Sequence, residues 1–250
     1  MIIGAHVPGS SPFLEAEEVG AECLQLFLGP PQSWKKPPPR ADADELAKSP
    51  VPVYVHAPYL INVASPNNRV RIPSRKILAD TVSRAEEIHA AGVIVHAGHA
   101  EDDVRRGFYR WRKVFEELDT TVPILIENTA GGENAMGRRV DTIAELWEAL
   151  DDCDVGFCFD TCHAHAAGED LTDVVERVLA AIGTIDLLHA NDSRDPPGTG
   201  ADRHANFVDG HIDGVALFEM VEASGAPAVI CETPWPGIGD DIVLLKELLR

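Results

Sequence analysis

The chain has 250 residues, of which 45% are hydrophobic and 25% are charged, a balance that suits a globular protein with a full core. Its formal net charge of −20 argues against a general binder of polyanions, and no apolar run is long enough to be a transmembrane helix. The N-terminus lacks the order of a signal peptide, and the five cysteines have no zinc-knuckle spacing, so we expect a reduced, cytoplasmic protein with no membrane partner.

Short apolar runs alternate with longer amphipathic segments along the chain. The runs with the composition of strands are residues 2–6, 23–28, 51–56, 93–96, 122–127, 155–160, 185–190 and 228–232. The segments with apolar residues at helical spacing are residues 12–20, 42–48, 73–91, 104–118, 141–150, 171–182, 214–223 and 240–249. This alternation predicts an α/β fold, a (β/α)8 TIM barrel formed by a single domain of residues 1–250. The alternative is a doubly wound open sheet, although no glycine-rich phosphate motif follows the first strand.

Most of the predicted strands end in a residue that can bind a metal ion. These residues are His56, His96, Glu127, Asp160, His189 and Glu232. In a barrel the carboxyl ends of the strands meet at one mouth, where unpaired carboxylates would repel one another and take up protons. One residue of this kind is more often a satisfied core residue, but six in register favour a metal centre.

Three further candidate ligands lie in loops of the same face: His163 after the sixth strand, and Asp202 and His204 after the seventh. With the strand ends they make four carboxylates and five histidines, which exceed the four positions of one tetrahedral zinc ion and suit two or three ions. Three divalent ions would leave the cluster positive, so it would favour an anion such as a phosphodiester. Cys162 could also be a ligand, but we interpret it as a neighbour in the turn.

The candidate ligands belong to an ordered set of motifs. The motifs are Gly4-Ala-His6-Val, Gln25-Leu-Phe27, Pro31-Gln-Ser-Trp34, His56-Ala-Pro-Tyr59-Leu-Ile-Asn62, Glu127-Asn-Thr-Ala-Gly131, Asp160-Thr-Cys-His163-Ala, Ala166-Ala-Gly168, His189-Ala-Asn-Asp192-Ser, Asp202-Arg-His204 and Cys231-Glu232-Thr. No single motif is decisive, but the ordered set is highly specific. Over essentially its whole length the chain resembles the endonuclease IV family of apurinic/apyrimidinic (AP) endonucleases (AP endonuclease family 2), in particular its shorter, actinobacterial-type members.

The resemblance implies a centre of three zinc ions, with manganese possible at one or more positions. It implies that the first ion is held by His56, His96 and Glu127, that Glu127 bridges to a second ion completed by Asp160, His189 and Glu232, and that His163, Asp202 and His204 hold the third. Glu127, Asp160 and Glu232 are then also the catalytic candidates. His165 matches no position of the family pattern, so we expect it to support or pack beside the ligands.

The activity implied by the resemblance is DNA repair. Family members cleave the phosphodiester bond 5′ to an abasic site in double-stranded DNA, leaving a 3′-hydroxyl and a 5′-deoxyribose phosphate. A hydroxide activated by several zinc ions is the nucleophile. The resemblance further implies removal of 3′-blocking groups from DNA ends.

Candidate DNA contacts lie in loops on the ligand side of the predicted barrel. They are Tyr59, Leu60, Asn62, Gln32, Trp34, Lys35, Arg69 and Arg203. In the family the loop equivalent to Tyr59 and Leu60 inserts at the lesion, as apolar wedges do, while a structural role is the alternative for Tyr59. The basic residues between Arg105 and Lys113 fit a solvated helix face better than a DNA contact.

Some segments depart from the family pattern. Relatives commonly read His-Pro-Gly-Ser-His where this chain has His96-Ala-Gly-His99-Ala, and often have Arg at the position of Gln32. The segment Asn206-Phe-Val-Asp-Gly210-His211 is altered as well. These departures leave the predicted metal ligands unchanged and concern the residues expected to bind the abasic site.

Two other functions compete with this interpretation. A metal-dependent sugar isomerase or epimerase on the same barrel needs one divalent ion and two catalytic carboxylates, and has no use for His163, Asp202 and His204 as a separate site. A DNA-binding or damage-sensing module without catalysis would not need the full ligand set. We expect a monomer, which suits a barrel that must clamp DNA.

Overall fold

The computed structural model describes residues 1–132 and 134–249 and contains a closed barrel of parallel strands. In chain order the barrel strands are β1 (Ile2–His6), β2 (Leu24–Leu26), β3 (Val53–His56), β4 (Gly92–His96), β5 (Ile124–Glu127), β6 (Gly156–Asp160), β7 (Leu187–Ala190) and β10 (Ala228–Cys231). The first strand pairs with the last, Ile2 opposite Ala228 and Ala5 opposite Cys231, which closes the barrel. The predicted TIM-barrel fold is therefore confirmed.

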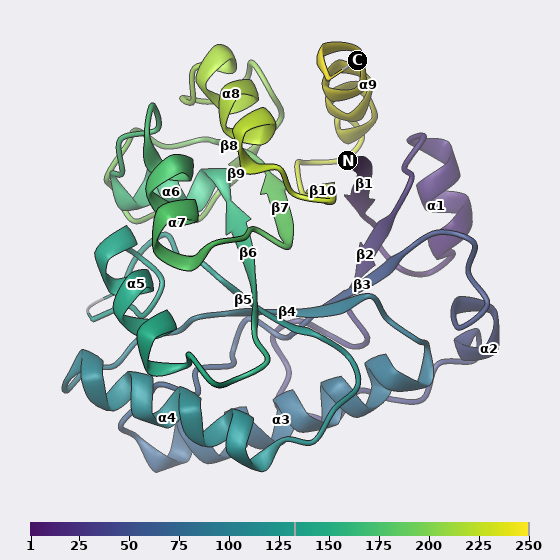
Figure 1. The fold of residues 1–250 in the computed structure, drawn as a ribbon. Coiled ribbons are helices and arrows are strands. Elements are labelled where there is room, and N and C mark those ends of the chain that lie inside the picture. Colours follow the sequence, from purple (N-terminus) through teal and green to yellow (C-terminus); the bar gives the residue numbers. More distant parts are fainter. Residues whose placement is uncertain (133, 250) are drawn as a thin grey trace.

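Helices surround the barrel on the outside (Figure 1). They are α1 (Pro12–Glu18), α2 (Ala43–Leu46), α3 (Asn68–Glu87), α4 (Val104–Glu117), α5 (Val140–Ala149), α6 (Thr161–Ala167), α7 (Val174–Ile182), α8 (Gly214–Ser224) and α9 (Ile238–Leu248). The prediction that the third helix begins at Pro73 was wrong, because Asn67 caps the helix by accepting a hydrogen bond from the N–H of Arg69. Pro73 lies inside the helix.

Two elements are absent from the sequence prediction. The helix α6 begins at Thr161, directly after β6 ends. The long loop after β7 contains a two-stranded antiparallel sheet formed by β8 (Asp192–Ser193) and β9 (His204–Ala205). This short sheet folds the loop back across the mouth of the barrel and carries the candidate ligand His204.

The interior of the barrel explains why the candidate ligands converge. Buried side chains fill its lower part, among them Tyr54, Ile94, Leu125, Cys158, Leu187 and Ile230. Because side chains alternate along a strand, the residue two positions later points into the same interior one level higher. Those residues are His56, His96, Glu127, Asp160, His189 and Glu232. A larger apolar cluster packs the opposite strand faces against the helices.

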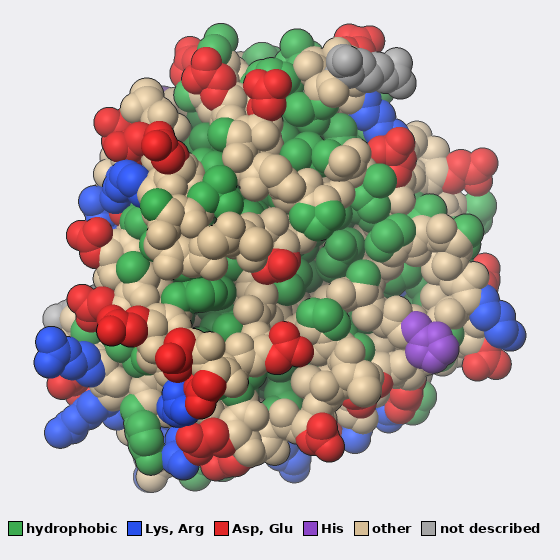
Figure 2. Space-filling model, viewed as in Figure 1, with side chains coloured by type: hydrophobic (Ala, Val, Ile, Leu, Met, Phe, Trp, Pro, Cys, Tyr) green, Lys and Arg blue, Asp and Glu red, His purple; other side chains and the backbone are tan. Residues whose placement is uncertain are grey.

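On the face seen in Figure 2, acidic and basic side chains are scattered among hydrophobic ones, and the clearest basic group lies at the lower left, beside α4. In the part of the chain that the structure describes, every helix is too short or too polar to span a membrane.

Candidate metal centre

The first ligand group joins the ends of three neighbouring strands. His56 ends β3, His96 ends β4 and Glu127 ends β5, and their ligand atoms lie within 4.8 Å of one another. Oε2 of Glu127 is 3.2 Å from Nε2 of His56 and 3.2 Å from Nε2 of His96. One carboxylate oxygen therefore faces two imidazole nitrogens in the geometry expected around a shared cation.

The other oxygen of Glu127 belongs to a second group. This group consists of Glu127, Asp160, His189 and Glu232. Nδ1 of His189 lies 3.1 Å from Oε1 of Glu127, 3.2 Å from Oε2 of Glu232 and 3.9 Å from Oδ2 of Asp160. Three carboxylates thus surround one imidazole nitrogen, an arrangement that needs positive charge among them.

The third predicted set also comes together. Nε2 of His163 lies 3.2 Å from Oδ2 of Asp202, and Nε2 of His204 lies 3.1 Å from Oδ1 of the same carboxylate. Asp160 forms a group with His163 and His204 as well, so it stands between the second and third sets. The thiol of Cys162 lies close enough to Asp202 and His204 to share a metal ion with them. The sequence had favoured a role for Cys162 in the turn over a role as a ligand.

The spacing between Asp160 and His163 is explained by α6. Asp160 ends β6 and caps the helix, because its Oδ1 accepts a hydrogen bond of 2.7 Å from the N–H of His163. The helix ends at Ala167 and is capped by Gly168, whose φ of +78° suits glycine. One short helix therefore turns His163 back over the barrel mouth.

Hydrogen bonds to protein oxygens orient the histidine rings. Nδ1 of His56 lies 2.7 Å from the carbonyl oxygen of Ala57, and Nδ1 of His163 lies 2.8 Å from that of Asn128. Nε2 of His189 lies 2.9 Å from Oε1 of Gln25. In each ring the other nitrogen then faces the carboxylates, which is how metal-binding histidines are commonly held.

Two asparagines that sequence reasoning missed position the carboxylate ligands, one through the backbone of Asp160 and the other through the carboxylates themselves. The side chain of Asn128 accepts a hydrogen bond from the N–H of Asp160 and donates one to its carbonyl oxygen. Nδ2 of Asn191 donates to Oδ2 of Asp160 at 2.7 Å and to Oε2 of Glu232 at 3.2 Å. Their positions in sequence, one residue after Glu127 and two after His189, were the available signal.

The surroundings of these groups favour positive charge. Burial would raise the pKa of the Glu127 carboxyl, but the charges of His96 and His189 hold that pKa well below its ordinary value. Burial raises the pKa of Asp160. Burial would lower the pKa of His189, yet the carboxylates of Glu232 and Glu127 raise that pKa to about 9. A bound cation can supply this charge in place of protons on the rings.

Two ring nitrogens support the same conclusion. Among the described residues, Nε2 of His163 and Nε2 of His204 are buried and lie within 3.2 Å of the Asp202 carboxylate, but neither has the geometry of a hydrogen bond. A buried imidazole nitrogen without a hydrogen bond is costly, whereas a metal ion between the ring and the carboxylate would use its lone pair. Imidazole nitrogens and carboxylate oxygens are donors that suit zinc. The residues of the mouth therefore fit a centre for divalent metal ions.

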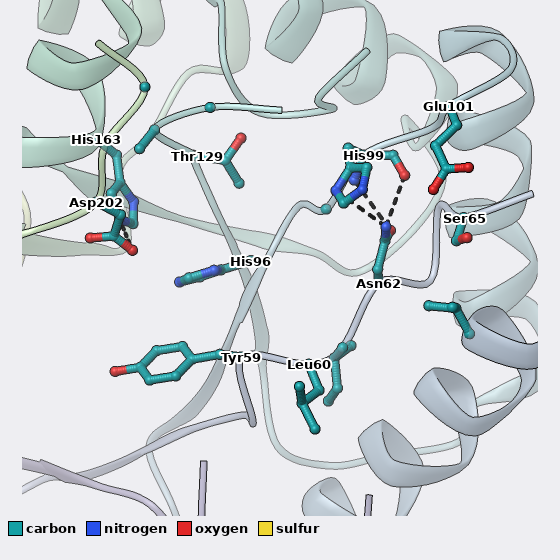
Figure 3. A pocket seen from close by; sticks show the side chains of 16 residues that line it. Tyr59, Leu60, Asn62, Ser65, His96, His99, Glu101, Thr129, His163 and Asp202 are labelled. Atoms are coloured by element: carbon teal, nitrogen blue, oxygen red, sulfur yellow. Dashed lines mark hydrogen bonds and ion pairs between the residues drawn. The ribbon is translucent and has the colours of Figure 1, made fainter. Parts of the chain in front are cut away.

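Two cavities open beside the ligands. One of about 440 Å³ is lined by residues that include Tyr59, Leu60, Asn62, His96, His163 and Asp202. In Figure 3 the ring of Tyr59 lies below His96, on the same side of the cavity as His163 and Asp202, and Asn62 is hydrogen-bonded to His99. A second cavity, of about 550 Å³, is lined by residues that include His56, Arg194, His204 and Glu232. Both give access to the ligand groups.

The candidate DNA contacts occupy different surroundings. Tyr59 and Trp34 are 48% and 43% exposed, and Gln32, Lys35 and Arg69 are also exposed. Leu60 is half-buried. The N–H of Tyr59 donates to the carbonyl oxygen of Pro31, which joins the two loops.

The side chains of Asn62, Arg203 and His165 contact other residues of the protein. Asn62 is buried, and its side chain donates to the carbonyl oxygen of His99 and accepts from the N–H of His99. The Arg203 guanidinium is paired with the carboxylate of Asp195. The ring of His165 lies against the carbonyl oxygen of Asp195 at 2.9 Å, outside the ligand groups.

Comparisons relate this site to known proteins. A family profile described as Xylose isomerase-like TIM barrel matches residues 13–249. The probable endonuclease 4 of Mycobacterium tuberculosis (strain ATCC 25177 / H37Ra) is 57% identical over 249 residues, which cover 99% of this chain and 98% of that protein. The crystal structure of endonuclease IV from Thermus thermophilus has a TM-score of 0.86 at 26% identity, covering 100% of this chain and 99% of that one. A D-tagatose 3-epimerase-like protein has a TM-score of 0.78 at 21% identity, covering 100% of this chain and 97% of that one. At this identity the similarity concerns the fold alone.

Proposed function

The chain belongs to the endonuclease 4 family of xylose isomerase-like TIM barrels, and from this premise we propose that it is a metal-dependent DNA-repair endonuclease. It hydrolyses the phosphodiester bond 5′ to an abasic site in double-stranded DNA, leaving a 3′-hydroxyl and a 5′-deoxyribose phosphate. It also removes blocking groups from 3′ ends. The observation that carries the proposal is the division of the mouth into overlapping ligand groups that share Glu127 and Asp160.

We propose that three zinc ions occupy these groups, with manganese able to replace zinc at one or more of them. The proposed ligands are His56, His96 and Glu127 for the first ion, Glu127, Asp160, His189 and Glu232 for the second, and His163, Asp202 and His204 for the third. When bound, divalent ions supply electrophilic stabilisation of the negative charge that develops on a phosphate during in-line displacement.

The protein's own groups have separate tasks in this reaction. The two oxygens of Glu127 face different histidines, which supports its role as the bridge between the first two groups. Asn191 holds Asp160 and Glu232 in fixed orientations through its amide nitrogen. Glu232 also lines the larger cavity, so its carboxylate can orient or deprotonate a water molecule that enters there.

DNA binding must overcome the net charge of −20. The exposed loops that carry Tyr59, Trp34 and Lys35 border the mouth, and Arg69 lies in the first turn of α3. We propose that Tyr59 and Leu60 insert at the lesion and that Lys35 and Arg69 contact phosphates. The protein acts as a monomer on its DNA.

The alternative is a sugar isomerase or epimerase. The likeness to the epimerase-like protein concerns the fold, which many functions share. The third ligand set favours the endonuclease, because an isomerase or epimerase that uses one ion would not need it. This set consists of His163, Asp202 and His204.

The test uses the metal-loaded protein and a duplex with a single abasic site. We expect incision 5′ to that site, no incision of the same duplex with an intact base, and no turnover of aldoses. Bound metal is measured on the same sample. Absence of incision from a protein that carries its full metal content would contradict the proposal, as would aldose turnover. A duplex with a blocked 3′ end tests the second activity.

A further inference from the structure

The strands β1 and β2 supply no ligand to the groups described above, yet each carries a polar side chain beside them. His6 ends β1 and is the register partner of Gln25 on β2. The strands approach closely because Gly4 lacks a side chain: a Cβ there would lie 2.0 Å from the carbonyl oxygen of Cys23. Gln25 has no exposure to solvent, although a buried amide is costly without full hydrogen bonding.

The carboxylate of Glu232 determines which way the Gln25 amide points. Nε2 of Gln25 lies 2.6 Å from Oε1 of Glu232 and 2.8 Å from Nδ1 of His6. An ionised carboxylate only accepts hydrogen bonds, so the amide nitrogen, with its two hydrogens, must face Glu232 and His6. The reversed amide would place two oxygens 2.6 Å apart.

The amide orientation in turn determines where His189 carries its proton. With the nitrogen facing Glu232, Oε1 of Gln25 faces Nε2 of His189 at 2.9 Å and can only accept. Nε2 of His189 must therefore carry the hydrogen. In the neutral ring that can bind a metal ion, Nδ1 is then the nitrogen with the free lone pair, and it is the one that faces Glu127 and Glu232.

We propose that Gln25 is a positioning residue of the metal centre, which fixes the tautomer of His189 and the orientation of Glu232 through a single amide. The inference rests on the proposed centre, because it concerns how two of its ligands are presented. It assigns a task to β2, a strand without a ligand. Loss of a hydrogen-bonding partner of this kind weakens metal binding by about 10–100-fold.

The first experiment compares metal affinity by competition with a chromophoric zinc chelator. Gln25→Met keeps the buried volume and removes every hydrogen bond of the amide, and we expect it to bind zinc about 10–100-fold more weakly than the wild type. Thr81→Val is the control, because it removes a buried hydrogen bond within α3, from the Thr81 hydroxyl to the carbonyl oxygen of Ile77. Its zinc affinity should equal that of the wild type. Equal affinity for Gln25→Met and wild type would overturn the proposal.

The second experiment needs no variant and decides the matter if Gln25→Met does not fold. In the zinc-loaded wild type, 15N-labelled histidine should show His189 with a proton on Nε2 and zinc on Nδ1. A proton on Nδ1, or zinc on Nε2, would overturn the proposal. Neither experiment measures DNA incision. A protein that binds zinc in this way but leaves abasic DNA intact would therefore contradict the proposed reaction and not the role of Gln25.

Discussion

Nδ1 of His189 lies 3.1 Å from Oε1 of Glu127, and neither side chain has any exposure to solvent. The other oxygen of Glu127 faces His56 and His96. One buried carboxylate thus contributes an oxygen to each of the two neighbouring ligand groups.

Glu127→Gln should abolish incision of abasic DNA and lower the metal content. The substitution keeps the shape but replaces one charged oxygen by a donor that faces imidazole nitrogens. The loss of zinc affinity should exceed the roughly 10–100-fold typical of losing a supporting hydrogen bond, because a ligand itself is lost. Metal analysis and an incision assay measure both effects, with Glu145→Gln on the exposed face of α5 as the control. Retained incision would remove Glu127 from its bridging role.

Removal of metal by a chelator should lower the thermal unfolding midpoint. Without cations the buried carboxylates of the second group repel one another, and the positive charge that faces them is that of the His189 ring, whose pKa they raise to about 9. Ions present at 100 times their Kd contribute about 2.7 kcal/mol, which for a chain of this size is a shift of about 5–10 °C. Calorimetry before and after chelation measures it, and added zinc should restore the midpoint. An unchanged midpoint would argue that the ions do not stabilise the fold.

Tyr59→Ala should weaken binding to abasic duplex without changing metal content. The Tyr59 ring is 48% exposed and packs edge-on against Phe27 and His56, so it projects from the mouth at a defined angle. Loss of an aromatic contact with a base costs about 1–3 kcal/mol, or about tenfold or more in affinity. Tyr109→Ala is the control, since Tyr109 is 60% exposed on α4 and should not affect binding. Equal losses for both variants would contradict the wedge role.

The affinity for abasic DNA should fall steeply with salt concentration. A few phosphate contacts must outweigh a chain whose net charge is −20, and such contacts release counterions. Lys35→Gln and Arg69→Gln should each reduce the slope of log affinity against log salt by about 1. Arg105→Gln, on an exposed position of α4, should leave the slope unchanged. A slope near zero in the wild type would show that phosphate contacts are not the source of affinity.

Asp241→Ala should lower the free energy of unfolding by about 3 kcal/mol, because it leaves buried donors without an acceptor. The carboxylate of Asp241 accepts hydrogen bonds from the Thr233 hydroxyl, the Asn206 amide and the N–H of Phe207. These bonds tie α9 to the segments that follow Glu232 and His204. Chemical denaturation measures the change. Asp240→Ala, the exposed neighbour in the same helical turn, should change it little, and equal effects would point to the helix terminus instead.

The barrel and the convergence of its ligands could be predicted because both follow from local rules. Apolar runs identify strands, parallel strands place their carboxyl ends together, and alternation sends His56, Glu127 and Asp160 into one interior. The order of the residues along each strand was therefore enough to bring the site together.

The roles of Gln25 and Asn191 could not be predicted, because they depend on which strands become neighbours and in which register. Gln25 reaches Glu232 across β1, and Asn191 reaches Asp160 from the adjacent strand end. The start of α3 was missed because Pro73 resembles a first-turn proline. The short helix α6 was missed although its signals, Asp160 and Gly168, are present in the sequence.

The pairing of β1 with β10 has a consequence for how the protein acquires its ions. Glu232 directly follows β10, which comes after the other seven barrel strands in the sequence and lies between β1 and β7. During synthesis on the ribosome the barrel therefore stays open until residues 228–231 have emerged, and the second ligand group lacks Glu232 although its other members have already been made. That group is thus complete only after β10 has joined β1 to β7.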